Sequence, residues 1–453
     1  MLRKHKIKAL ACFLLLSLLL PTTALANSTP VYMEQYPSFN IAPLNGTPIV
    51  VDKEKLIFQI DERSSSQAVV TAKYTLTNTS LEHQTVPMLF PFISLGYRNV
   101  KSTILFNDQA VDYKVFAAGR VDVRDYLQAP VEFKQQTDID KIIATLNEPL
   151  YKAVHFDDTA NATLYKVTFR PPTERQCRIQ FALDPAQTRL LAYGFNGFEL
   201  NQNGEGAVFT YISDKKIAET GYILVLGSDT ITDIECDYSD TLEKSQVITK
   251  DFIMSKIGET GYDIGNWDKD NLYSLLLKEI DRFFTHGQLV FTYDILMEYI
   301  FNYNNISTLL YEIDFAPNST NTLQITFPMR ATIDRRETVD YINTFAYLLN
   351  PARNFADFGA IDISIELNSQ QPYIIDSSLP LTEAAPGIYT AVLNSLPTED
   401  LIFSTYPKRE ITFIDQLRAK ILPRGYGGVL LGIVALLLLG ILALALIYRA
   451  LTK

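Results

Sequence analysis

Histidine and cysteine are scarce in this chain, which has four histidines and three cysteines among its 453 residues. His5 and Cys12 fall within the first 26 residues, which have the pattern of a cleaved leader. The remaining histidines and cysteines do not stand at the spacing of a metal site: no His-Glu-x-x-His, Cys-x-x-Cys or EF-hand loop occurs. We therefore expect no metal ion and no other cofactor.

The sequence also lacks the motifs of common hydrolases and nucleotide-binding enzymes. It has no Gly-x-Ser-x-Gly elbow, no Gly-rich phosphate loop after a strand, and no cysteine in the setting of a nucleophile. Residues 155–158, His-Phe-Asp-Asp, are the densest group of possible metal ligands, and we interpret them as an acidic surface loop. A glycosidase needs only two carboxylates, so that class stays open as an alternative.

Basic residues are outnumbered, with 40 lysines and arginines against 51 aspartates and glutamates. The leader removes Arg3, Lys4, Lys6 and Lys8, which leaves 36 basic residues and a net charge of about −15. An acidic surface of this kind disfavours nucleic acid or anionic lipid as the main binding partner.

What the sequence does contain is one long uncharged stretch near its C-terminus. Residues 426–448 read YGGVLLGIVALLLLGILALALIY, and ~1.5 Å per residue gives a helix of roughly 34 Å, enough to cross a hydrocarbon core of ~30 Å. No polar face interrupts this run. We interpret 425–448 as a transmembrane helix that is followed by a cytoplasmic tail, 449–453.

The N-terminus predicts a secretory signal peptide. Basic residues within 3–8 precede the apolar run 9–20, and Ala24-Leu25-Ala26 forms a small-residue cleavage site. Signal and span together place residues 27–424 outside a plasma membrane that the chain crosses once. Neither Leu-Pro pair near the span continues as Leu-Pro-x-Thr-Gly, so we expect the chain to stay in the bilayer.

Alternating aromatic, β-branched and polar residues predict a mainly β ectodomain. The clearest strand is 68–78, where Val70, Ala72, Tyr74 and Leu76 alternate with polar residues. Comparable patterns predict strands at 56–60, 86–92, 100–106, 109–116, 163–169, 176–183, 207–213, 221–226, 322–328, 338–349, 360–367, 388–393 and 401–406.

Two stretches of the chain resemble sequences of known families. Tyr74-x-Leu76-x-Asn78-Thr79-Ser80, followed by Leu89-Phe90-Pro91-Phe92, resembles the opening of uncharacterised secreted or membrane-anchored bacterial surface protein families. The run from Tyr347 to Phe358, with the apolar alternation of 361–365, is similar to their end. The resemblance implies an immunoglobulin-like first domain and a Gram-positive surface protein, and it implies no activity.

Helical spacing occurs in three places. Residues 138–146 predict a short amphipathic helix, 272–284 a longer one capped by Asp268, Asp270 and Asn271, and 292–303 a third. We therefore predict a mainly β fold of the α+β class, with immunoglobulin-like β-sandwich domains, a helical insertion and one C-terminal transmembrane helix.

These patterns predict the following organisation: signal peptide 1–26, N-terminal β-sandwich domain 27–127, second β-rich region 128–247, helical insertion 248–310, C-terminal β region 311–407, juxtamembrane stalk 408–424, transmembrane helix 425–448 and cytoplasmic tail 449–453.

Three groups of residues are candidates for binding or pairing. Tyr32, Tyr36 and Phe39 could stack on a ligand if exposed, although we favour packing onto the first domain. Cys177 and Cys236 could form a disulfide in an oxidising compartment or remain as two free thiols. The spacing of Gly428, Gly432 and Gly440 would allow two spans to approach closely.

The function that these observations favour is ligand binding or protein interaction by a membrane-tethered extracellular domain, without catalysis. An extracellular hydrolase of polysaccharide or peptidoglycan is one alternative. The other is an accessory subunit whose span docks to a membrane transporter or sensor.

Overall fold

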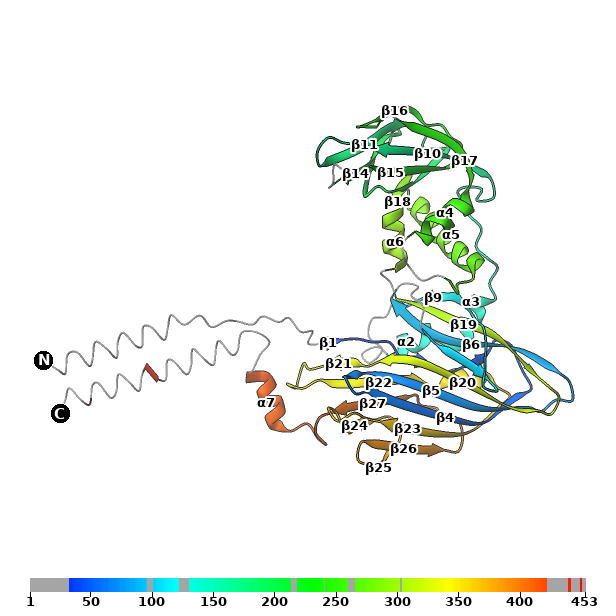
Figure 1. Ribbon diagram of the computed structural model, residues 1–453, viewed down its shortest axis with the longest axis vertical. Helices are drawn as coiled ribbons and strands as arrows, with labels where there is room; N and C mark the ends of the chain where they lie inside the picture. The colour runs from blue at the N-terminus through cyan, green and yellow to red at the C-terminus, as the bar shows by residue number, and fades with distance from the viewer. Residues whose placement is uncertain are drawn as a thin grey trace.

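The computed structural model describes residues 32–95, 101–121, 130–212, 218–239, 241–259, 265–301 and 304–421, together with 439–440 and 449. Figure 1 shows two bodies of β-sheet, one above the other, with helices between them. We call the lower body the base; it is built from 32–121 and 304–406. We call residues 130–301 the insertion, and its sheets, which form the upper body, the head.

The base joins strands from both ends of the chain. Its sheets have the strand orders β25-β26-β23-β4-β5-β20-β7-β8, β1-β21-β22-β27-β24 with β2 beside β22, and β3-β6-β19-β9. The strands before the insertion are β1 (Tyr32–Met33), β2 (Ser38–Phe39), β3 (Ala42–Pro43), β4 (Ile49–Asp61), β5 (Ser64–Asn78), β6 (Gln84–Leu95), β7 (Thr103–Phe106), β8 (Gln109–Ala110) and β9 (Lys114–Arg120). Those after it are β19 (Asn304–Phe315), β20 (Thr320–Arg330), β21 (Thr332–Asp334), β22 (Ile342–Leu348), β23 (Asp357–Glu366), β24 (Tyr373–Ser377), β25 (Thr382–Ala385), β26 (Ile388–Leu393) and β27 (Leu401–Tyr406).

The mainly β character predicted from the sequence is confirmed, and β5 shows why the pattern was readable. Val70, Ala72, Tyr74 and Leu76 are all buried, and the polar residues between them face the other side of the sheet. β5 pairs with β4 and β20 along most of its length. Because neighbouring side chains on a strand point to opposite faces, a strand with one buried face must alternate in this way.

A bulge in β4 reverses which residues of that strand are buried. Ile49 and Val51 are buried before it, Asp52 and Lys53 are both exposed, and the even-numbered residues from 54 to 60 are buried after it. The parallel neighbour β23 accommodates the bulge with Gly359, because a Cβ there would lie 2.2 Å from the Asp52 carbonyl oxygen. Glu54 is carried onto the buried face as a result.

Aromatic side chains fill the space between the base sheets. Phe58 of β4 meets Phe403 of β27 edge-on at 5.3 Å between ring centroids, and Phe403 stacks on Phe345 of β22 at 5.2 Å. Phe90 of β6 and Phe327 of β20 lie 4.8 Å apart. Truncating a fully buried phenylalanine to alanine typically costs about 3–5 kcal/mol, so these pairs hold the sheets face to face.

The insertion forms the head and the helices beneath it. Its sheets have the orders β17-β10-β15-β12-β18 and β13-β14-β11-β16. A separate buried cluster, which includes Phe169, Phe181 and Phe195, lies between them. The strands are β10 (Asn161–Phe169), β11 (Arg175–Ala182), β12 (Thr188–Tyr193), β13 (Gly197–Leu200), β14 (Glu205–Ile212), β15 (Glu219–Gly227), β16 (Thr232–Cys236), β17 (Leu242–Ile248) and β18 (Val290–Thr292).

The described helices up to residue 421 are α2 (Pro130–Gln136), α3 (Ile139–Leu146), α4 (Thr249–Gly258), α5 (Lys269–Thr285), α6 (Tyr293–Phe301), the 3₁₀ helix η1 (Asn350–Asn354) and α7 (Phe413–Ile421). The three helices predicted at 138–146, 272–284 and 292–303 correspond to α3, α5 and α6 and begin within three residues of the predicted starts; the other described helices were not predicted as separate elements. Asp268 caps α5 by accepting hydrogen bonds from the backbone N–H groups of Asp270 and Asn271, and Asp138 caps α3.

Two predicted segments differ from the structure. The sequence extends the helical region to 310, whereas residues from 304 onward form β19, which pairs with β6 and β9. The sequence also predicts a strand over 109–116 as the second arm of a hairpin. Gln109–Ala110 pair with β7 as β8, and the chain then crosses to another sheet as β9. In both places long-range pairing decides the structure, and local spacing does not reveal it.

The insertion is fastened to the base along β9, the edge strand of its sheet. The backbone N–H of Val115 donates to the carbonyl of Asn266 at 2.8 Å, and the N–H of Asp268 donates to the carbonyl of Val115 at 3.0 Å. The Asn271 side chain accepts from the N–H of Ala117 at 2.8 Å. The start of α5 therefore covers the free edge of β9 and fixes α5 relative to the base.

The segments expected to lie in or beside the membrane are mostly outside the described residues. This applies to the signal peptide 1–26, to the tail except for Arg449, and to the span 425–448 except for 439–440. Within the described ranges, no helix combines the length and the apolar character that crossing a bilayer requires. The stalk expected at 408–424 contains α7.

Candidate functional site

A groove lies beside α5, beneath the head. Its volume is about 370 Å³, which lies in the range of small-molecule sites, and it is open to solvent. One wall comes from the segment after α3, a second from the start of α4, and the floor from α5. The residues that line it are Leu150, Tyr151, Asp158, Thr159, Ile248, Lys250, Asp270, Tyr273, Ser274 and Leu277.

Two polar side chains of α5, two turns apart on one face, hold the first wall in place. Ser274 accepts from the N–H of Tyr151 at 2.6 Å. Asp281, whose side chain is 2% exposed, accepts from the Tyr151 hydroxyl at 3.0 Å and faces the His155 Nδ1 at 3.1 Å. The backbone N–H of Val154 also donates to Asp281. A buried carboxylate with this many donors holds the segment 151–155 against the helix.

A tight turn then directs the next residues along the groove. Asp157 accepts from the N–H of Thr159 at 2.9 Å and from its hydroxyl at 2.6 Å, and these bonds hold the pKa of Asp157 below its usual range. Asp158 and Thr159, at the end of this turn, line the groove. The predicted surface loop at 155–158 thus supplies both an anchor and part of the cavity wall.

The opposite wall and floor combine apolar surface with charge. Lys250 at the start of α4 forms an ion pair with Asp270 at 2.6 Å, and its ammonium lies 5.3 Å from the centre of the Tyr273 ring. Burial, and then the charge of Asp158, raise the pKa of Tyr273, so its hydroxyl stays protonated at any physiological pH. The groove therefore has two carboxylates and one ammonium beside an apolar surface.

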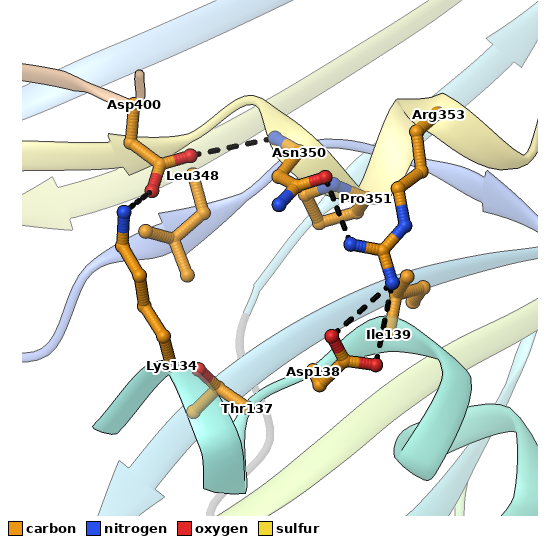
Figure 2. Close-up of a pocket in the computed structure, with 9 residues that line it drawn as sticks. All are labelled: Lys134, Thr137, Asp138, Ile139, Leu348, Asn350, Pro351, Arg353 and Asp400. Atoms are coloured by element: carbon orange, nitrogen blue, oxygen red, sulfur yellow. Dashed lines mark hydrogen bonds and ion pairs between the residues drawn. The ribbon is translucent and has the colours of Figure 1, made fainter. Parts of the chain in front are cut away.

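A second, smaller cleft lies between α2, α3 and η1, and Figure 2 shows its residues. Lys134 is paired with the buried Asp400 at 3.2 Å, and Asp400 also accepts from the N–H of Leu349 at 3.0 Å. Arg353 reaches both Asp138, at 3.1 Å, and Asp140, at 2.9 Å. The cleft holds about 60 Å³, room for roughly two waters. We interpret it as a clamp between insertion and base.

A buried polar cluster lies inside the base. Glu54 accepts from the Asn40 amide at 2.9 Å, and the Tyr74 hydroxyl donates to the Asn40 side-chain oxygen at 2.5 Å. The other Glu54 oxygen, Oε1, has no hydrogen-bond partner among the described residues. Burial raises the pKa of Glu54 to about 7. The side chain is 0% exposed, so it cannot contact a ligand in solution.

A lysine is enclosed by aromatic rings under the head. The Lys256 ammonium lies 4.3 Å from the centre of the Tyr222 ring and 4.6 Å from that of Tyr193, with Phe252 at 5.7 Å. Glu259 accepts from Lys256 at 2.8 Å and from the Tyr193 hydroxyl at 2.9 Å. This cage is filled by the protein's own cation, and it ties α4 to β12 and β15.

The residues singled out from the sequence lie elsewhere. Phe39 is buried in the base, Tyr36 stacks on Phe133 with 6.3 Å between ring centroids, and Arg336 covers the Tyr32 ring at 4.3 Å. None of the three lines the groove. Asp158 and Asp270 do line it, although the sequence indicated only an acidic loop and a helix cap there. The groove itself was missed because the strongest signal was indirect: Asp281 is an acid within the apolar stripe of α5, where it must have partners.

The cysteine and glycine candidates are placed as follows. Cys177 on β11 and Cys236 on the neighbouring β16 are free thiols, and the register pairs Cys236 with Ile179. The two cysteines are therefore diagonal neighbours. Gly428 and Gly432 lie outside the described residues, and a Cβ on Gly440 would meet no described atom within 4 Å.

Comparison with known proteins adds little to this picture. No protein-family model matches the chain, and no curated protein matches it. Among solved structures, it is similar to a proposed nutrient binding protein from Legionella pneumophila, at 9% identity and a TM-score of 0.35, over 85% of this chain and 74% of that one.

Proposed function

We propose that this protein is a membrane-tethered extracellular binding protein, and that the groove beside α5 takes a small apolar ligand carrying a positive charge. The observation that carries the proposal is the groove itself, with about 370 Å³ of space beside α5. The tether is the apolar run 425–448, and the signal peptide 1–26 exports the rest.

The composition of the groove supports this ligand class. Leu150, Ile248 and Leu277 offer apolar surface, and Tyr273 adds an aromatic ring whose hydroxyl is buried. Lys250 neutralises one of the two carboxylates, Asp270, and leaves Asp158 to attract a cation. Apolar walls with a few placed polar groups are typical of sites that bind and orient a small molecule.

The proposal includes no reaction. A hydrolase would use two carboxylates in one cleft, and Asp158 and Asp270 are the pair that this class would require. Asp270, however, is paired with Lys250 at 2.6 Å and lies in the exposed first turn of α5. The carboxyl of Glu54, whose pKa lies near 7, is fully buried inside the base. This arrangement favours binding over acid–base chemistry.

Ligand-observed NMR on the purified full-length protein tests the proposal. The probes are phenethylamine, neutral phenethyl alcohol and anionic hydrocinnamate, which share one apolar part and differ in charge. We expect binding to weaken in that order, and Asp158→Asn to reduce the advantage of the amine.

Ile248→Trp should fill the groove and abolish binding. The matched control is Leu81→Trp, because Leu81 is 83% exposed between β5 and β6, in the base. Equal binding of all three probes, or binding that survives in Ile248→Trp, would refute the groove as the site.

A further inference from the structure

α7 leaves an apolar stripe uncovered immediately before the predicted span. Phe413 is 74% exposed, Ile414 59% and Leu417 40%. At ~100° per residue these three side chains fall within about one quarter of the helix circumference. Large apolar side chains gathered on one face of a soluble surface mark a place where something else binds.

Hydrogen bonds hold the first turn of α7 in place, so Phe413 and Ile414 lie on an ordered turn. Thr412 and Asp415 form a reciprocal capping box: the Asp415 N–H donates to the Thr412 hydroxyl at 3.3 Å, and the Thr412 N–H donates to the Asp415 carboxylate at 3.1 Å. Lys408 also contacts Asp415, and Lys408 and Thr412 lower the pKa of that buried carboxyl to about 2. The first turn of the helix is thereby fixed.

Chain length limits how far α7 can be from the membrane. α7 ends at Ile421, and only residues 422–424 separate it from the apolar run that begins at 425. Four Cα–Cα steps reach roughly 14 Å when fully extended. A helix joined this closely to a membrane span must lie at or beside the headgroup layer.

Local charge agrees with that position. The chain as a whole is acidic, but residues 408–424 contain five basic residues, Lys408, Arg409, Arg418, Lys420 and Arg424, against Glu410 and Asp415. Basic residues next to an apolar helical face are typical of helices that lie in the membrane interface.

We propose that α7 lies along the surface of the bilayer, with Phe413, Ile414 and Leu417 inserted among the lipid headgroups toward the acyl chains. The inference rests on the proposed tether at 425–448. It adds that the base is held against the lipid at a second point and does not swing from a flexible stalk. Figure 1 shows α7 beside the base, away from the head.

The test places a tryptophan on the stripe of the full-length protein. Phe413→Trp is reconstituted in vesicles of phosphatidylcholine and phosphatidylglycerol whose chains are brominated near the headgroup. Trp267, the sole native tryptophan, is buried in the insertion and supplies the background. We expect blue-shifted emission and loss of most of the added fluorescence. Gln416→Trp, on the flank of α7, should be quenched less, and Leu81→Trp, in the base, not at all.

Flotation of the same vesicles separates this inference from the tether. If Phe413→Trp floats with the vesicles while its added fluorescence remains unquenched, the inference is overturned and the tether stands. Protein that does not float would overturn both. Added fluorescence that is shielded from aqueous iodide but unquenched by brominated lipid would place a protein on the stripe, which also overturns the inference.

Discussion

Replacing Glu54 by glutamine should stabilise the base relative to the native protein at high pH. At low pH the two proteins should be about equally stable. The carboxyl of Glu54 is fully buried, and burial raises its pKa from 4.5 to about 7. Between those values the unfolded chain releases the proton while the folded chain keeps it. The free energy of unfolding of the native protein therefore falls as pH rises from 4.5 to 7.

The size of the effect follows from the pKa difference. Each pKa unit corresponds to about 1.4 kcal/mol, so the loss amounts to about 3 kcal/mol above pH 7 and is absent below pH 4.5. Glutamine stays neutral throughout and can still accept from the Asn40 amide, which lies 2.9 Å from the Glu54 oxygen. We expect Glu54→Gln to match the native protein within about 1 kcal/mol at pH 4 and to exceed its stability by up to about 3 kcal/mol at pH 8.

Hydrogen exchange of peptides from β4 and β5, measured across pH 4–8, reports the opening of the base without requiring the whole chain to unfold in one step. The matched control is Glu366→Gln on the neighbouring β23, an exposed glutamate that accepts from Gln59 at 3.0 Å. The control should leave the pH profile unchanged. Parallel profiles for the native protein and Glu54→Gln would refute the reasoning, because Glu54 would then not keep its proton on folding.

Three further substitutions test the other contacts. Asp281→Ala should lower local stability by about 2–4 kcal/mol, because it leaves the donors of 151–155 unpaired, and this should appear as faster hydrogen exchange there. Lys256→Met keeps the length of the side chain but removes the ammonium from its ring cage, and thermal unfolding of the insertion should show a loss of about 1–2 kcal/mol. Arg353→Lys loses a guanidinium whose Nη2 donates to Asp138 and Asp140 and whose Nη1 donates to Asn350; because these contacts are partly exposed, urea denaturation should show a loss of about 1 kcal/mol or less.

The sequence was most informative where one element has one buried face. The alternation in β5 predicted its buried face, and the 3.6-residue spacing predicted most of the buried face of α5, since those patterns depend only on local geometry. The same rule could have revealed Glu54, which stands two residues before Leu56 on the face that also carries Phe58. A glutamate on the same face of a strand as core residues is predicted to be buried and to need a hydrogen-bond partner there.

The pairing of distant segments could not be predicted in this way. β4 lies parallel to β23, about 300 residues later, and β9 and β19 are neighbours across the whole insertion. The boundaries expected at 127 and 311 fall near the two ends of that insertion, and the segments outside them form common sheets. The groove was hidden for the same reason, because its walls come from segments about 90–120 residues apart in the chain.

The way α5 lies along β9 has a consequence for any shortened form of the chain. Arg120 and Asn305 sit opposite each other, so a short linker could replace everything between them. Such a product would nevertheless expose the backbone amide and carbonyl groups of β9 that residues 266–271 now hydrogen-bond. Copies of it would associate through the exposed edge of β9 and sediment as oligomers. The insertion thus prevents the base from polymerising.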